Sequence, residues 1–198
     1  MDAFALLDLP RRAFLAPDEV RAAFQKAAAA SHPDGAADET ERLNRTRRFQ
    51  QINEASAALI PVAARLRHLL FLEYPDYSLP RAAVMDDPLV QLFSQVGAAV
   101  QQAASWTRQT GEATTFLARA ALTRQGMQVQ EALEAAGAAV RSAQESLEAS
   151  LREADAARTI GTDGVAGMLG PLSQRAGFLE KWQTQLQAAW ASVFAAGL

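Results

Sequence analysis

Residues 31–36 have the sequence Ser-His-Pro-Asp-Gly-Ala and contain one of the chain's only two histidines. A helical pattern precedes them, with apolar residues at spacings of three and four: Val20, Ala23, Phe24 and Ala27. Pro33 must end that helix, because its ring removes a backbone donor and disfavours helical geometry in the preceding residue. Taken alone, the tripeptide predicts only a surface turn, in which proline and aspartate are common.

Helical patterns continue on both sides of this turn. Asp2 can cap a short first helix that ends before Pro10, and a second helix begins at Pro17. After the turn, a third helix runs from near Thr40 to Pro61, and a fourth runs to about residue 74. The second and third helices, packed antiparallel, would share an apolar core and present the turn as an exposed tip. That core would contain Phe24, Phe49 and Ile52.

The second half of the chain is also helical in pattern, so the sequence predicts an all-α protein. Prolines at 75, 80 and 88 predict a linker over 75–88, and residues 89–198 predict an antiparallel bundle of about three helices. The first of these helices ends near either Thr110-Gly111 or Gln125-Gly126. A heptad-like series marks the middle helix: Met127, Leu133, Val140, Leu147 and Leu151. We expect a loop over 161–170, followed by a last helix from about Phe178 to Phe194.

Composition excludes several classes of function. The chain has no cysteine, which removes disulfides, thiolate metal sites and cysteine catalysis. Residues 1–80 carry 10 Lys/Arg against 11 Asp/Glu, and the rest carry 9 against 11, so we expect no nucleic-acid binding. We find neither a signal-peptide pattern nor an uncharged apolar window of about 18 residues, and we therefore expect a cytoplasmic protein without membrane contact.

The residue patterns also offer no chemistry for catalysis. The two histidines, His32 and His68, are too few and too far apart to predict a metal site. The chain has no nucleophile–base arrangement, and its glycine-rich stretch over 161–170 lacks the lysine of a phosphate-binding loop. We expect no enzymatic activity, no metal and no cofactor.

With its flanking helices, the His-Pro-Asp turn resembles the J domain, the module by which co-chaperones engage DnaK-type chaperones. The resemblance covers residues 2 to about 74, and we assign 1–74 to this domain. It rests on four segments: the aromatic-leucine run Phe4–Pro10, the run Val20–Phe24, the signature His32-Pro33-Asp34, and Phe49–Ala55, which resembles the family's Phe-x-x-Ile-Asn-x-Ala helix. The segment that begins at Arg65 occupies the place of the family's closing Arg-x-x-Tyr.

The resemblance implies that the signature triggers ATP hydrolysis by the partner chaperone, while basic residues of the second helix dock against it. The expected chaperone-binding residues are His32, Pro33, Asp34, Arg21, Lys26 and Arg65. An ionised Asp34 accepts hydrogen bonds only and suits pairing with an arginine of the partner. A further basic group on the third helix could supplement docking, or it is a solvated face offset by Glu39 and Glu41.

Among J-domain proteins, the chain is most similar to the HscB type of iron–sulfur cluster co-chaperone. The J domain stands first, a helical bundle follows, and the segment Gly177–Trp182 resembles that family's Arg-Phe-Leu-Asp-Lys-Leu helix. The resemblance implies an HscA-like, DnaK-type chaperone and an iron–sulfur cluster scaffold protein as partners. Candidate scaffold contacts in the bundle are Leu89, Phe93 and Phe178.

Other interpretations stay open on the sequence alone. Phe178, Trp182 and Trp190 recur at helical spacing, which core packing explains without a client. The bundle could take an unrelated client or make the protein oligomerise. A J-like adaptor that no longer activates any chaperone is a third possibility, because the second helix carries few basic residues.

Overall fold

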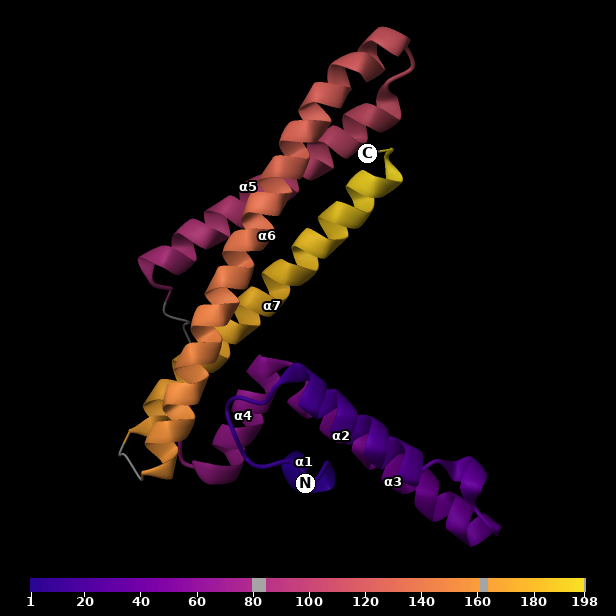
Figure 1. The fold of residues 1–198 in the computed structure, drawn as a ribbon, viewed down its shortest axis with the longest axis vertical. Coiled ribbons are helices and arrows are strands. Elements are labelled where there is room, and N and C mark those ends of the chain that lie inside the picture. The colour runs from indigo at the N-terminus through magenta and orange to yellow at the C-terminus, as the bar shows by residue number, and fades with distance from the viewer. Residues whose placement is uncertain (80–84, 161–163, 198) are drawn as a thin grey trace. The chain divides into compact units, whose positions relative to one another are not determined.

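The computed structural model describes residues 1–79, 85–160 and 164–197, apart from the side chains of Pro33, Phe116 and Arg119. This part of the chain is all-α, as the sequence predicted, and contains no strand. Its elements are α1 (Ala3–Leu6), α2 (Pro17–Ala30), the 3₁₀ turn η1 (Pro33–Gly35), α3 (Glu39–Leu59), α4 (Val62–Glu73), α5 (Asp87–Glu112), α6 (Phe116–Thr159) and α7 (Val165–Ala195) (Figure 1).

The chain forms two compact units. The first combines Met1–Ala83 with Leu147–Gly177, and the second combines Val84–Ser146 with Phe178–Leu198. The J-like segment of residues 1–74 therefore shares its unit with residues 147–177, which the sequence had assigned to the bundle. The division into a domain, a linker and a bundle stays a prediction.

Aspartate side chains cap the start of two helices of the first unit. Asp2 accepts the backbone N–H groups of Phe4 and Ala5, so it caps α1 as predicted. Asp38 accepts the N–H of Glu41 at 2.7 Å and thereby begins α3. Helices α2 and α3 lie side by side as a hairpin, and η1 lies at the turn between them (Figure 1).

Helices α3 and α4 meet at a sharp corner at Ile60-Pro61, with 104° between their axes. Apolar side chains of both helices fill the core beside this corner: Ile52, Leu59, Leu66 and Leu69. Within the described residues, no single helix has the length and apolar composition of a membrane span, although this bent pair passes the same test by length and composition.

The end of α6 is anchored to the loop before α2. The Asp155 carboxylate accepts the backbone N–H groups of Ala13 at 2.7 Å and Phe14 at 2.9 Å. Arg158 donates to Asp155 at 2.8 Å and pairs with Glu73 of α4 at 2.6 Å. This Asp155–Arg158 anchor joins the end of α6 to the other elements of the first unit.

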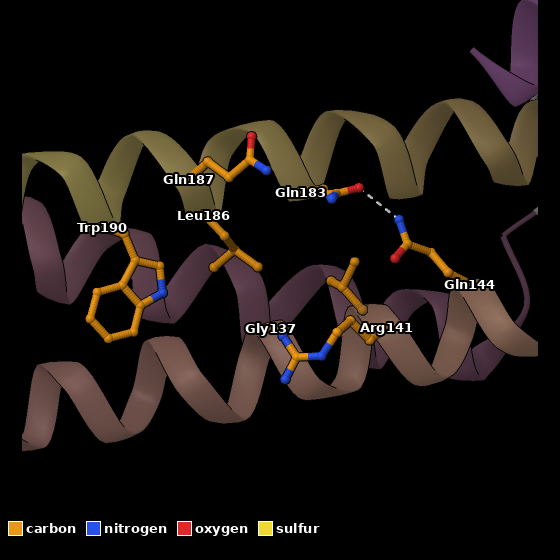
Figure 2. A pocket seen from close by; sticks show the side chains of 8 residues that line it. Gly137, Arg141, Gln144, Gln183, Leu186, Gln187 and Trp190 are labelled. Atoms are coloured by element: carbon orange, nitrogen blue, oxygen red, sulfur yellow. Dashed lines mark hydrogen bonds between the residues drawn. The ribbon is translucent and has the colours of Figure 1, made fainter. Parts of the chain in front are cut away.

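The second unit is a three-helix bundle of α5, residues 116–146 of α6 and residues 178–195 of α7 (Figure 1). Trp106 of α5 donates its indole N–H to the carbonyl of Leu122 in α6 at 2.9 Å. Between α6 and α7, Gln144 donates to Gln183 at 2.8 Å, beside a groove of about 160 Å³ (Figure 2). Polar side chains and an indole line this groove: Arg141, Gln144, Gln183, Gln187 and Trp190, beside Gly137, Val140 and Leu186.

Three sequence expectations change in detail. Of the two possible breaks after α5, the one at Thr110-Gly111 is correct, and Gln125-Gly126 lies within α6. Met127, expected in the apolar series of α6, is exposed, whereas Val129 is buried. The last two residues of the predicted linker 75–88 belong to α5, which begins at Asp87, and its residues 80–84 lie outside the described part.

The loop expected over 161–170 is wrong for its second half. Helix α7 begins at Val165 and continues through Pro171, while 161–163 lie outside the described residues. Val165 and Leu169 are buried, which favours helix against the local preference of glycine and proline. Gly170 also allows a close approach, because its Cα faces the ring of Tyr77 and a Cβ there would overlap the phenol.

Candidate functional site

The His-Pro-Asp segment lies at the tip of the α2–α3 hairpin and is open to solvent. The side chains of His32 and Asp34 are 53% and 88% exposed. Pro33 begins η1, although its side chain lies outside the described part. Within the described chain, no lysine or arginine pairs with Asp34, so its carboxylate is available to an external cation.

The loop has an internal hydrogen-bonded arrangement. The backbone N–H of Asp34 donates to Nδ1 of His32 at 3.3 Å, and the Asp34 carboxylate lies 3.5 Å from the same nitrogen. A neutral ring that accepts at Nδ1 carries its proton on Nε2. The ring edge of His32 meets Phe49 of α3, with centroids 5.8 Å apart and planes at 80°. The exposed tip therefore offers an imidazole donor and a carboxylate acceptor.

The two expected docking cations on α2 are exposed. Arg21 lies 3.2 Å from Asp18 of its own helix, and Lys26 lies 4.0 Å from Asp8. Both pairs are on the surface, where such contacts contribute little and exchange readily for a partner's carboxylates. Because α2 also carries Glu19, its two cations are balanced by two acids, and the helix has no net charge.

Arg65, expected to bind the chaperone, is instead a buried structural residue with 2% of its surface exposed. Its guanidinium donates to the carbonyls of Ala13 at 3.1 Å and Leu59 at 2.9 Å. Leu59 is the last residue of α3, where helix carbonyls lack partners within the helix. A docking protein cannot reach this side chain, so the assignment of Arg65 as a contact residue is wrong.

An aromatic cluster on the second unit contains two of the three expected client contacts. Trp182 is buried between Phe178, stacked at 5.8 Å, and Phe93, tilted at 6.1 Å. Phe93 is 56% exposed and Phe178 half-buried. Leu89, the third expected contact, is only 3% exposed, because it faces the bundle core, and it cannot contact a client.

Sequence reasoning missed residues in both regions. Val90 is exposed one helical turn before Phe93 and extends the apolar face; the spacing of three between them was the signal. Glu41 and Arg45 contact the His-Pro-Asp loop, although the sequence showed them only as part of a charged helix surface. Among the described residues, no group of three potential ligands could hold a metal ion.

Comparison with known proteins gives a likeness in structure only. No protein-family model matches the chain, and no curated protein matches it. Among solved structures, the chain is similar to chaperone HscB from Vibrio cholerae, with a TM-score of 0.59, 18% identity, and coverage of 98% of this chain and 99% of that one. It is also similar to the human co-chaperone protein HscB, with a TM-score of 0.60, 14% identity, and coverage of 95% and 81%. The chain thus has the fold of the HscB co-chaperones.

Proposed function

We propose that this protein is a J-domain co-chaperone that stimulates ATP hydrolysis by a DnaK-type chaperone. One observation carries the proposal: the His-Pro-Asp segment lies at the exposed tip of a helical hairpin, and no lysine or arginine of the described chain pairs with the Asp34 carboxylate. The fold shared with HscB co-chaperones supports it.

The loop would act by binding one state of the chaperone better than the others. A partner changes a conformational equilibrium only through such a difference in affinity. Asp34 would pair with an arginine of the chaperone, since guanidinium–carboxylate hydrogen bonds are strong and directional. His32 would add a donor beside it. The contact would favour the hydrolysis-competent state of the ATPase.

Docking through α2 would be weak. Arg21 and Lys26 offer two exposed cations, but the helix has no net charge to steer association over long range. A dissociation constant in the range of tens of micromolar, about 6 kcal/mol of binding free energy, suits a transient co-chaperone contact.

The aromatic cluster would bind the client. The apolar face consists of Phe93, Val90 and the half-buried Phe178. The buried Trp182 packs against both phenylalanine rings. Exposed aromatic side chains on a rigid support are frequent anchors of protein–protein interfaces. An iron–sulfur cluster scaffold protein is the client that the resemblance suggests.

Single-turnover ATP hydrolysis by a DnaK-type chaperone of the HscA kind tests the chaperone contact. The wild-type protein should accelerate hydrolysis, and Asp34→Asn, which keeps the shape but removes the charge, should abolish the effect. Asp76→Asn is a matched control, because Asp76 is an exposed aspartate outside the hairpin. Equal stimulation by all three proteins would contradict the proposal.

A pull-down of an iron–sulfur scaffold protein tests the client contact. Phe178→Ala and Phe93→Ala should each weaken capture, whereas Phe194→Ala should not. Phe194 is an exposed phenylalanine on the same helix as Phe178, about 24 Å further along it. Capture that is the same for all three variants would favour a different client or an oligomerising role for the bundle.

A further inference from the structure

Two residues one turn apart on α3 contact the His-Pro-Asp loop at its opposite ends. Arg45 donates from Nη1 to the carbonyl of His32 at 3.3 Å. Glu41 accepts the backbone N–H of Ala37 at 2.7 Å. The two side chains are joined to each other, because Nε and Nη2 of Arg45 both donate to Oε1 of Glu41, at 3.0 and 2.7 Å. This Glu41–Arg45 clasp therefore bonds to the loop at both His32 and Ala37, near its two ends.

The start of α3 explains the position of Glu41. Asp38 caps the helix, and Glu41 is the third residue after it, where a glutamate usually bonds back to the N–H of the cap itself. Here the carboxylate reaches one residue further, to Ala37, and so holds the loop instead of the helix end. The Ala37 N–H first, and then Arg45, lower the pKa of Glu41 below its usual 4.5, so the clasp stays ionised at neutral pH.

The clasp differs from the neighbouring ion pair of the same helix. Glu39 and Arg42 are joined at 2.6 Å, but their side chains are 66% and 56% exposed, and in the described chain they bond to each other and not to the loop. Glu41 and Arg45 are less exposed, at 39% and 30%. The two pairs carry the same charges on the same turns, and only one of them bonds to the loop. The Glu39–Arg42 pair is therefore an internal control.

Gly35 supplies the space that the clasp occupies. A Cβ built at Gly35 would lie 2.7 Å from Nη1 of Arg45, which is closer than real contacts allow. The backbone of Gly35 is not in the left-handed region, so glycine is needed here for room and not for conformation. Since the blocking atom is the end of a flexible side chain, Gly35→Ala would displace the guanidinium without unfolding the hairpin.

We propose that the Glu41–Arg45 clasp is a positioning device that holds the His-Pro-Asp loop in the conformation bound by the chaperone. The proposal rests on the function proposed above and assigns no chaperone contact to either residue. A loop without the clasp samples other conformations, and apparent affinity falls in proportion to the fraction that stays competent. If that fraction falls to about a tenth, half-maximal stimulation needs about tenfold more protein.

Kinetic measurements separate the effect of the clasp from that of Asp34. Glu41→Ala and Arg45→Ala should each raise the half-maximal concentration in the single-turnover assay about tenfold, with a nearly unchanged maximal rate. Asp34→Asn should instead abolish the maximal stimulation. The controls Glu39→Ala and Arg42→Ala remove the same charges and should leave both quantities unchanged. Arg45→Lys, which keeps the charge but not the fork of donors, should lie between wild type and Arg45→Ala.

A double substitution tests the geometry. Gly35→Ala should raise the half-maximal concentration in the wild-type background, because it displaces Arg45. In the Arg45→Ala background there is no guanidinium to displace, and Gly35→Ala should then add little. Equal effects of Gly35→Ala in the two backgrounds would overturn the clasp geometry.

Amide hydrogen exchange at Ala37 tests the clasp without any chaperone. Glu41→Ala should increase that exchange rate at least tenfold over Glu39→Ala, because only Glu41 accepts the Ala37 N–H. Equal exchange in the two variants overturns the clasp, whatever the ATPase assay gives. Absence of stimulation by the wild type would overturn the proposed function instead, so the two failures are distinguishable.

Discussion

At the scale of single residues, Arg65 was expected to contact a chaperone, but it is buried and stabilises the fold instead. Its guanidinium bridges the end of α3 and the loop before α2, through the carbonyls of Leu59 and Ala13. If Arg65 no longer donates to one of these two buried carbonyls, that carbonyl is left without its hydrogen bond, which costs about 1–3 kcal/mol.

Arg65→Lys should therefore lower the free energy of unfolding by about 1–3 kcal/mol, since one ammonium does not reproduce the fork that reaches both carbonyls. Chemical denaturation measures the loss. Because Arg65 is not exposed, the half-maximal concentration in the ATPase assay should stay the same at temperatures where the variant is folded. An increase in that concentration with unchanged stability would restore Arg65 as a contact residue.

His68 should make the first unit sensitive to acid. Its Nε2 accepts the backbone N–H of Ala3 at 3.0 Å, and its ring stacks on Phe4. Partial burial lowers the pKa of His68 below its usual 6.5; Asp2 opposes this shift, and the N-terminal amine and Arg11 reinforce it. A lowered pKa in the folded state means that folding favours the neutral ring. That stabilisation is complete above pH 6.5 and is lost as the pH falls through the lower, folded-state value.

Unfolding midpoints of the wild type and His68→Gln, measured between pH 7.5 and pH 5, test this effect. Glutamine offers an acceptor that does not titrate, so the wild type should lose stability relative to the variant below about pH 6.5. A difference between the two proteins that stays constant with pH would show that Ala3 does not depend on a neutral His68.

Sequence information at this scale was strongest where residue type alone restricts geometry. Pro33 and the flanking helices predicted the exposed turn, because a proline must end α2. Arg65 and Leu89 were placed wrongly, since a single position on a helix does not reveal which face is covered. The role of Glu41 and Arg45 depends on hydrogen bonds to loop backbone, which no residue pattern encodes.

At the scale of helices, patterns of apolar spacing predicted most elements, and local propensity failed in one. The stretch before Pro171 contains several glycines, which predicted a loop, yet α7 already begins at Val165. Burial of Val165 and Leu169 within the first unit outweighs the intrinsic cost of glycine in a helix, about 1 kcal/mol per residue. That burial comes from neighbours distant in sequence and is invisible to a local pattern.

Two helical glycines should respond to alanine in opposite directions. Gly97 of α5 has open space where an alanine methyl would stand, with no atom within 4 Å, so Gly97→Ala should raise the free energy of unfolding by about 0.5–1 kcal/mol. Gly170 of α7 lies against the ring of Tyr77, and Gly170→Ala should cost about 1–3 kcal/mol through overpacking. Chemical denaturation of both variants is the measurement. Equal stabilisation by both would show that Tyr77 moves away freely.

At the scale of the whole molecule, the structure links the J-like segment to residues 147–177 of the chain. The Asp155–Arg158 anchor holds the backbone at Ala13 and Phe14, and the Arg152 guanidinium lies 3.8 Å over the Phe14 ring. Residues that the sequence assigned to separate domains thus complete one compact unit. No sequence pattern predicted this, because it depends on hydrogen bonds between residues more than a hundred positions apart.

Asp155→Ala should lower the free energy of unfolding by about 1–3 kcal/mol, because it removes the acceptor of two backbone N–H groups and a partner of Arg158. Glu148→Ala is the control. It breaks the exposed pair with Arg152 in the same part of α6 and should change stability by less than about 0.5 kcal/mol. Chemical denaturation, monitored through hydrogen exchange of the backbone amides in α1–α4, would measure the change in unfolding free energy of both variants. Similar values for the two variants would show that the anchor does not stabilise the unit.

The most direct test of the proposed co-chaperone function is single-turnover ATP hydrolysis by a DnaK-type chaperone, titrated with the wild type, Glu41→Ala and Asp34→Asn. We predict full stimulation by the wild type, the same maximal rate at about tenfold higher concentration for Glu41→Ala, and no stimulation by Asp34→Asn. Undiminished stimulation by Asp34→Asn, or none by the wild type at concentrations well above tens of micromolar, would contradict that function.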